Sequence, residues 1–386
     1  MAEKATVFSG IDSIGDFDSL LLGKRIGLLT GAAGISKQAR ETIDILAERY
    51  HLTALFGPEH GVRGDIQAGG KVESYTDPKL GIPAFSVYGG DNRPTPEMLR
   101  EIDILVVDLQ EASVRFYTFL YSLANAMTAC AEAGIPVVVT DRITPLGGVE
   151  VAGTILSPGM SSFIGNYELP TRIGLTIGEY AGYVNEYLNL GYDLTVVPLT
   201  GWKRSMYFDE TDVPWVFPSP NLPTIDSTFA YVGTCIFEGT NVSEGRGTTR
   251  PFELIGAPWL DTEALTANMA KRGHAGALLR KTYFTPSFSK YKDEMCAAIQ
   301  IHITDRSVCE PFRLGLLLLE EIWKLHPDKL TFLSNDLNHS KHYALDHLLG
   351  TDSFRRREHD AESLIQAHAA GIEHFRQAKV KYHLYE

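Results

Sequence analysis

The chain has 386 residues, of which 44% are hydrophobic and 22% charged, and its formal net charge is −13. This length is more than one hydrophobic core usually fills, so two domains are expected, and the composition excludes a largely disordered protein. The negative charge argues against binding to nucleic acid or to an anionic membrane surface, and a small anionic ligand would need a local group of arginines.

The sequence shows neither a signal peptide nor a membrane span. Its start lacks a basic segment followed by an apolar one, and apolar runs such as residues 313–320 are much shorter than the roughly 18 residues that a span requires. The four cysteines form no CxxC pair, which favours buried free thiols in a reducing compartment; they are Cys130, Cys235, Cys296 and Cys309. We therefore expect a cytoplasmic protein, although a leader removed earlier would escape this test.

Short strands alternate with helices in the first part of the chain. The predicted strands are residues 24–30, 52–56, 102–107, 135–140 and 231–237, and the predicted helices are residues 38–50 and 111–133. Buried strands separated by helices are typical of a mostly parallel sheet that is covered on both faces. Ligands of such sheets bind beyond the carboxyl ends of the strands, so the polar residues that follow each strand are the first functional candidates.

The pattern changes toward the end of the chain. A helix (176–190) and a strand (192–198) precede residues 201–224, whose prolines and tryptophans predict a long ordered loop. The later predicted elements are helices at 264–272, 311–326 and 361–379 and a strand at 295–304. We therefore predict an α/β fold with a Rossmann-like, mostly parallel sheet domain at 1–258 and a smaller α+β domain at 259–386.

The segment GPEHGVRG (residues 57–64) follows a predicted strand. Its glycines allow sharp turns, and its proline restricts the backbone. Glu59 and His60 are thereby expected on a stiff, exposed loop, where a carboxylic acid could protonate a leaving-group oxygen. The alternative is a solvated loop in which both residues are incidental.

Two further strand ends carry charged residues. Asp108 ends one strand, and Glu111 and Arg115 would share one face if a helix started there. Asp141 and Arg142 follow another strand. The alternatives are a helix cap at Asp108 and structural ion pairs, which would serve the fold and leave these residues without a functional role.

The segment EGTNVSEGRGTTRPFE (residues 238–253) has the density of polar residues expected of a ligand-binding loop. It is not a phosphate loop, because no Gly-Lys-Ser/Thr follows its glycines. Residues 30–34 (TGAAG) resemble a dinucleotide loop only loosely, so binding of NAD is a weak alternative. No HExxH segment occurs, and no metal is expected.

Seven segments together resemble one known family. They are GPEHGVRG, SVYGG (86–90), DLQEASVRFYTF (108–119), LPTRIGLTIGE (169–179), VPWVFPSPNLPT (213–224), EGTNVSEGRGTTRPFE and YFTPSFSKY (283–291). In this order, along nearly the whole chain, they resemble the NamZ-type exo-β-N-acetylmuramidases, long a domain family of unknown function. One position departs from that pattern, because Asp is expected where this chain has Glu111, and this puts Glu111 in doubt as an essential group.

The resemblance implies a Rossmann-like N-terminal domain, a smaller C-terminal domain and an active site in the cleft between them. It implies an exo-acting glycoside hydrolase that releases N-acetylmuramic acid from the non-reducing end of peptidoglycan fragments, without a cofactor. The partner is then a small saccharide, and a cytoplasmic location implies recycling of imported cell-wall fragments.

Glycoside hydrolysis needs two carboxyl groups that flank the bond, or a substitute for one. Glu59 is our candidate for the general acid, and His60 would orient it or bind a sugar hydroxyl. For the second carboxylate, Glu244 is the first candidate and Asp108 the second, and the 2-acetamido group of the substrate is the third option.

The remaining candidates would bind the substrate. A guanidinium can bind the lactyl carboxylate of muramic acid through two parallel hydrogen bonds; the candidates are Arg63, Arg115, Arg172 and Arg246. Asn221 and Asn241 would bind the acetamido group, and Tyr117, Trp215 or Phe217 would stack on a sugar. The predicted contacts are completed by Asp141, Arg142 and Glu238. Two rival functions stay open: a non-catalytic protein that binds muropeptides or sugars, and an enzyme that uses a nucleotide or NAD on the same scaffold.

Overall fold

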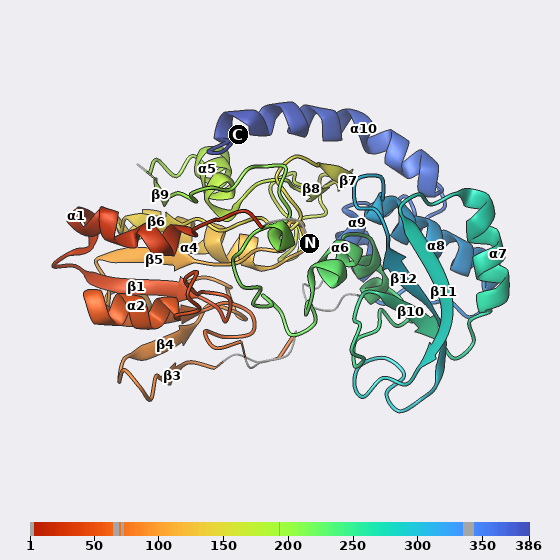
Figure 1. Ribbon diagram of the computed structural model, residues 1–386, viewed down its shortest axis with the longest axis horizontal. Helices are drawn as coiled ribbons and strands as arrows, with labels where there is room; N and C mark the ends of the chain where they lie inside the picture. Colours follow the sequence, from red (N-terminus) through yellow and green to blue (C-terminus); the bar gives the residue numbers. More distant parts are fainter. Residues whose placement is uncertain (1–3, 65–68, 71–72, 193, 335–342) are drawn as a thin grey trace.

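The computed structural model describes residues 4–64, 69–70, 73–192, 194–334 and 343–386. Figure 1 shows two lobes, with a large sheet in one and a smaller sheet in the other, and a long helix that runs across the top of both.

The large sheet is mostly parallel. Its seven strands have the order β3-β4-β2-β1-β5-β6-β9, and only β3 and β4 pair antiparallel. The strands are β1 (Arg25–Thr30), β2 (His51–Gly57), β3 (Tyr75–Thr76), β4 (Pro83–Ser86), β5 (Ile104–Asp108), β6 (Val137–Thr140) and β9 (Thr195–Val197). The chain builds outward from β1 through β2 to β4 and then returns to the other side of β1 with β5. This reversal puts the topological switch point, where such sheets bind ligands, between β1 and β5.

Helices cover both faces of this sheet, as the sequence predicted. Leu28 and Val106 pack in one core with residues of η1 and α2, whereas Leu29 and Val107 pack in another with residues of α4 and α5. Neighbouring residues of a strand point to opposite faces, so each strand contributes to both cores. The helices of this lobe are η1 (Gly10–Phe17), α1 (Asp18–Leu21), α2 (Thr42–Arg49), α3 (Pro96–Leu99), α4 (Phe119–Ala133) and α5 (Ile177–Tyr187).

The smaller lobe contains an antiparallel sheet with the strand order β10-β12-β11. The predicted fold class is therefore confirmed. Its strands are β10 (Leu254–Ala257), β11 (Ala277–Phe284) and β12 (Cys296–Ile303), and its helices are α6 (Ile225–Thr234), η3 (Cys235–Gly239), α7 (Thr262–Arg272), α8 (Pro311–Leu325) and α9 (Ala344–Leu349). The long final helix is α10 (Ala361–Ala378), and η5 (Lys379–Tyr382) follows it. The predicted domain boundary between residues 258 and 259 stays a prediction.

The long loop predicted at residues 201–224 has no helix or strand except the short η2 (Phe208–Glu210). Before it, β7 (Ala152–Ile155) and β8 (Pro170–Arg172) form a two-stranded antiparallel sheet.

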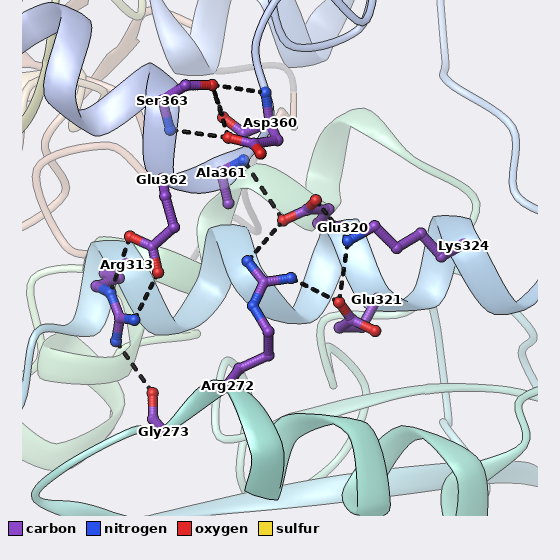
Figure 2. A network of polar contacts seen from close by, with 10 residues as sticks. All are labelled: Arg272, Gly273, Arg313, Glu320, Glu321, Lys324, Asp360, Ala361, Glu362 and Ser363. Carbon is purple, nitrogen blue, oxygen red and sulfur yellow. Dashed lines mark hydrogen bonds and ion pairs between the residues drawn. The ribbon is translucent and has the colours of Figure 1, made fainter.

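Helix α10 connects the two lobes. At its start, Glu362 pairs with Arg313 of α8 at 2.5 Å, beside a network in which Arg272 bridges two glutamates of the same helix (Figure 2). Further along, the Ile155 N–H of β7 donates to Nδ1 of His368 at 3.2 Å. Contacts at the start and in the middle of one helix therefore fix the two lobes against each other.

One predicted strand is wrong. Residues 231–237 end α6 and form η3, so the segment 238–253 follows a helix and not a strand. Every residue of α6 except Asp226 is buried. A helix buried on all sides lacks the polar stripe that identifies a surface helix, and a short apolar run in it resembles a buried strand.

Two predicted helices start later than expected. The segment 111–133 becomes helical only at Phe119, and the helix predicted at 38–50 begins at Thr42. Before Phe119 the chain pairs with β8, since the Arg115 N–H donates to the Thr171 carbonyl at 2.8 Å. Glu111 and Arg115 therefore do not lie on one helix face, and Asp108 caps no helix.

Helices α6 and α8 cross at two glycines. A Cβ built on Gly315 would lie 2.1 Å from the carbonyl oxygen of Gly233, and one built on Gly233 would lie 1.8 Å from that of Pro311. The two backbones are therefore in direct contact at the centre of the smaller lobe.

We predict that Gly315→Ala lowers the free energy of unfolding by about 2 kcal/mol, because the backbones must separate. Alanine would otherwise stabilise a helix interior by about 1 kcal/mol relative to glycine. The midpoint of urea unfolding measures the change. Gly182→Ala in α5 is the control, since its new Cβ would meet only Tyr382, at an ordinary 3.6 Å. Similar midpoints for the two variants would contradict the tight crossing.

Candidate active site

Glu59 lies on a tight loop directly after β2. His60 and Gly61 both adopt a left-handed backbone, with φ of 75° and 74°, and the Gly61 N–H donates to the Pro58 carbonyl at 2.9 Å. A left-handed histidine costs about 1 kcal/mol or more, so the surrounding contacts must hold His60 in this conformation. The expectation of an exposed loop is wrong: Glu59 is 9% exposed and His60 4%, because neighbouring segments cover both side chains.

Three donors hold the Glu59 carboxylate. Oε2 accepts from the Thr118 hydroxyl at 2.7 Å, and Oε1 accepts from the Gly69 N–H at 2.9 Å and the Tyr88 hydroxyl at 3.4 Å. Thr118 directly precedes α4 and Tyr88 follows β4, so segments far apart in the chain position one carboxyl group. The sequence analysis missed both hydroxyls; their only signal was that they lie within the segments that carry the family resemblance.

Tyr117 connects this carboxylate to the long loop at residues 201–224. Its hydroxyl donates to the Pro218 carbonyl at 2.7 Å. Burial, and after it the negative charges of Glu59 and Glu111, raises the pKa of Tyr117 well above its ordinary value. The phenol therefore stays neutral and remains a donor to Pro218.

Asp108 and Arg142 form a buried ion pair at the switch point. Nε and Nη2 of Arg142 donate to the two carboxylate oxygens of Asp108 at 2.6 and 2.8 Å, and both side chains are almost completely buried. The hydroxyls of Thr140 and Thr42 donate to the same carboxylate. Both oxygens of Asp108 thus have donors within the protein, as in a structural ion pair.

Asp141 binds the start of α5. It accepts from the Gly178 N–H at 2.7 Å, from the Thr176 hydroxyl at 2.7 Å and from the Tyr385 hydroxyl. Burial raises its pKa to about 6, and these donors oppose the shift. Its contacts serve the fold and join the end of the chain to the main sheet.

Glu111 is a buried acid that lacks one partner. One carboxylate oxygen accepts from the Ser113 N–H, whereas Oε1 is buried without any hydrogen bond among the described residues. Burial raises its pKa to about 8, while Thr144 and Ser113 oppose the shift. Glu111 is therefore protonated at neutral pH.

The guanidinium of Arg115 binds backbone carbonyl groups. Its guanidinium is completely buried and donates to the carbonyls of Thr154 at 2.6 Å, Leu169 at 2.9 Å and Leu348 at 2.8 Å. Burial lowers its pKa to about 10. Leu348 belongs to α9, so Arg115 links the two lobes and has no solvent-facing side for a substrate.

The other predicted arginines of the large lobe differ in exposure. Arg172 is 4% exposed and donates to the Leu146 carbonyl. Arg63 is 32% exposed and pairs with the buried Asp77 at 3.0 Å and with the exposed Glu41. Only Arg63 therefore combines solvent access with a place on the Glu59 loop.

Glu244 lies in the smaller lobe between two cations. Its Oε2 pairs with Lys290 at 2.8 Å and its Oε1 with Arg246 at 3.4 Å, and the side chain is 2% exposed. Arg246 also pairs with Glu238 at 2.5 Å. The motif at residues 238–253 thus forms an internal charge network.

The two predicted asparagines occupy different places. Asn241 holds residues 329–331, because its side chain donates to the Lys329 carbonyl and accepts from the Thr331 N–H, both at 2.8 Å. Asn221 is buried in the long loop, where its own N–H bonds to Ser219 at 3.4 Å.

The described part of the chain contains no group of three or more metal-ligating side chains. Nor does any helix in those ranges have the length and apolarity to cross a membrane. The loop after β1 closes through the Gly34 N–H, which donates to the Gly31 carbonyl at 2.9 Å, but α2 begins only at Thr42. A dinucleotide site needs a helix start directly after this loop, so the geometry disfavours NAD.

Comparison with known proteins decides the family. The model of the N-terminal part of exo-β-N-acetylmuramidase NamZ matches residues 26–226, and the model of its C-terminal part matches residues 229–385. The chain belongs to the NamZ family. The two matches meet between residues 226 and 229, which lies within α6.

Relatives and solved structures agree with this assignment. The chain is 44% identical to the peptidoglycan β-N-acetylmuramidase NamZ of Bacillus subtilis (strain 168), over 100% of this chain and 92% of that protein. Two crystal structures of DUF1343 family proteins from Bacteroides fragilis NCTC 9343 are also similar. They have TM-scores of 0.88 and 0.77 at 32% and 28% identity, and each comparison covers 98% of this chain and 99% of the other.

We predict that Glu111→Gln becomes progressively more stable than the native chain as the pH rises from 5 to 8. The pKa of Glu111 is raised from 4.5 to about 8, so in this range the folded state holds a proton that the unfolded state has released. Native stability therefore falls with rising pH, by at most about 1.4 kcal/mol per pH unit from this group, and Gln does not titrate.

Urea unfolding of both proteins at several pH values measures this difference. Parallel curves of stability against pH would contradict a buried, neutral Glu111.

Proposed function

We propose that this chain is an exo-acting β-N-acetylmuramidase that releases N-acetylmuramic acid from the non-reducing end of peptidoglycan fragments. Family membership across both halves of the chain supports this activity. The observation that carries the mechanism is the carboxyl group of Glu59, which three segments position beyond the end of a parallel strand.

In this proposal Glu59 is the general acid. A glycosidic oxygen is a poor leaving group unless it receives a proton as the bond to the sugar breaks. The hydrogen bonds from Thr118 and Gly69 fix the direction of the carboxyl group, so that little reorganisation is needed when the substrate arrives. Because all three contacts are donated to Glu59, the proton for the leaving group would be carried on Oε2, for which Thr118 is the donor within the described residues. The left-handed His60 lies beside it and would contact a sugar hydroxyl.

The second group of the mechanism is better supplied by the substrate. Asp108 is paired with Arg142 through both oxygens, and Glu244 is paired with Lys290 and Arg246. A carboxylate held in this way is a weak nucleophile or base. We therefore favour the third option, in which the 2-acetamido oxygen of the muramic acid attacks its own anomeric carbon as the glycosidic bond breaks and the leaving oxygen takes the proton of Glu59. Water then opens the resulting oxazolinium ring and releases N-acetylmuramic acid.

Recognition of the lactyl group is assigned to Arg63. It lies four residues after Glu59 and is partly exposed, and one of its partners, Glu41, is itself half exposed. A lactyl carboxylate that displaced Glu41 would keep the guanidinium paired. Asn221 would bind the acetamido group, whereas Arg115, Arg142, Arg172, Arg246, Asp141, Glu238 and Asn241 hold the fold.

We also propose that the protein acts in the cytoplasm on imported fragments during cell-wall recycling. Four buried free cysteines support a reducing compartment. Fractionation of cells that express the full chain, with detection of the protein, tests this location, and recovery outside the cytoplasm would contradict it.

We predict that Glu59→Gln lowers kcat by about 10³-fold on the disaccharide of N-acetylmuramic acid and N-acetylglucosamine, because no proton reaches the leaving group. The loss should be much smaller on 4-nitrophenyl β-N-acetylmuramide, whose leaving group departs without a proton. Release of sugar and of chromophore measures the two rates, with 4-nitrophenyl β-N-acetylglucosaminide to test recognition of the lactyl group.

Glu48→Gln, a change of an exposed glutamate on α2, is the control. Near-native turnover of the disaccharide by Glu59→Gln would overturn the assignment of the acid. Binding of the disaccharide by the native protein without any turnover would favour a sugar-binding protein.

A further inference from the structure

We propose that Phe217 is a stacking platform for the sugar on the leaving-group side of the cleaved bond. The inference rests on the proposed function, because it names how the same site binds the rest of the peptidoglycan fragment.

The side chain of Phe217 is exposed, whereas the neighbouring residues of the loop are buried or partly buried. It is 44% exposed, and it is the one exposed residue between Val213 and Ile225, a stretch that is described throughout. A single exposed apolar side chain needs no explanation by itself. Here, however, the flanking apolar side chains Trp215 and Leu222 pack into the core, whereas the phenyl ring turns to solvent.

The backbone around Phe217 is held rigidly. The indole N–H of Trp215 donates to the Pro223 carbonyl at 3.1 Å, and the Trp215 ring meets the edge of Phe208 at 4.9 Å between centroids. Pro218 restricts the backbone of the preceding Phe217 to extended conformations. A rigid loop loses little conformational entropy when a ligand stacks on it, which is the property of a preformed binding surface.

The same loop is hydrogen-bonded to the segment that holds the candidate acid. The Pro218 carbonyl accepts from Tyr117 at 2.7 Å, and the hydroxyl of the next residue, Thr118, donates to Glu59 at 2.7 Å. The charge of Glu59 also contributes to the raised pKa of Tyr117. Two hydrogen bonds and two peptide bonds, Phe217–Pro218 and Tyr117–Thr118, with the side chain of Tyr117 between them, therefore connect Phe217 to the carboxyl group of Glu59.

The difference in exposure indicates which sugar Phe217 meets. Glu59 is 9% exposed, so the terminal sugar, whose glycosidic oxygen must reach this group, lies in the interior. The leaving group of an exo-acting enzyme continues outward to solvent, where Phe217 stands. One face of a pyranose ring carries mainly C–H groups, which pack on a flat aromatic ring and remove apolar surface from water.

The test compares two unactivated substrates that differ only on the leaving-group side. They are the disaccharide of N-acetylmuramic acid and N-acetylglucosamine and the methyl β-glycoside of N-acetylmuramic acid. Phe217→Ala should lower kcat/KM on the disaccharide about tenfold, mainly through KM, and change it less than about twofold on the methyl glycoside. Phe217→Tyr should be near native on both, and Phe217→Leu, which keeps the apolar volume without a flat ring, should resemble Phe217→Ala.

Tyr283→Ala, a change of a 68% exposed aromatic residue on β11, is the control and should leave both substrates unaffected. Equal losses on both substrates, or no loss on the disaccharide, would overturn the platform. If the native protein cleaves neither substrate, both the proposed function and the platform fail. If it cleaves both substrates and the Phe217 variants do not discriminate between them, only the platform fails.

Discussion

The buried ion pair between Asp108 and Arg142 is the constraint on which the carboxyl edge of the main sheet depends. It joins the ends of β5 and β6 at the switch point, and Thr42 and the Ile35 carbonyl bind the same two side chains. Loss of either partner would leave an uncompensated buried charge, at a cost of about 3–5 kcal/mol. The segment that starts at Asp108 ends at Thr118, whose hydroxyl donates to Glu59.

Polar residues at the strand ends thus divide into two kinds. The first kind has all or most of its hydrogen-bond partners inside the protein and fixes the relative positions of strands, helices and lobes. It comprises Asp108, Asp141 and Arg115. Glu59 instead lies on a strained loop and accepts hydrogen bonds from three segments of the chain. Arg63 on the same loop is partly exposed to solvent. Buried charges must be paired in any protein, so density of charge alone does not identify a site. The distinction lies in the charge of the partners: Asp108 and Glu244 are paired with cations, whereas the described donors to Glu59 are neutral.

Much of the architecture follows from the sequence. The strands at β1, β2, β5 and β6 were predictable because continuous apolar runs closed by polar residues are typical of a buried parallel sheet. Helix α6 and the start of α4 were not, since burial on every side removes helical periodicity and pairing with β8 overrides local preference. At the site, the GPEHGVRG segment and the family resemblance pointed to Glu59. The internal partners of Arg115 and Glu244 come from distant segments, and no local pattern in the sequence predicts them.

The most direct test of this account is a crystal structure of the Glu59→Gln variant with the intact disaccharide of N-acetylmuramic acid and N-acetylglucosamine. The account predicts the glycosidic oxygen within hydrogen-bond distance of the side chain at position 59, the lactyl carboxylate beside Arg63, and the acetamido oxygen beneath the anomeric carbon. A disaccharide bound with its glycosidic oxygen at Glu244 of the smaller lobe, away from Glu59, would contradict it.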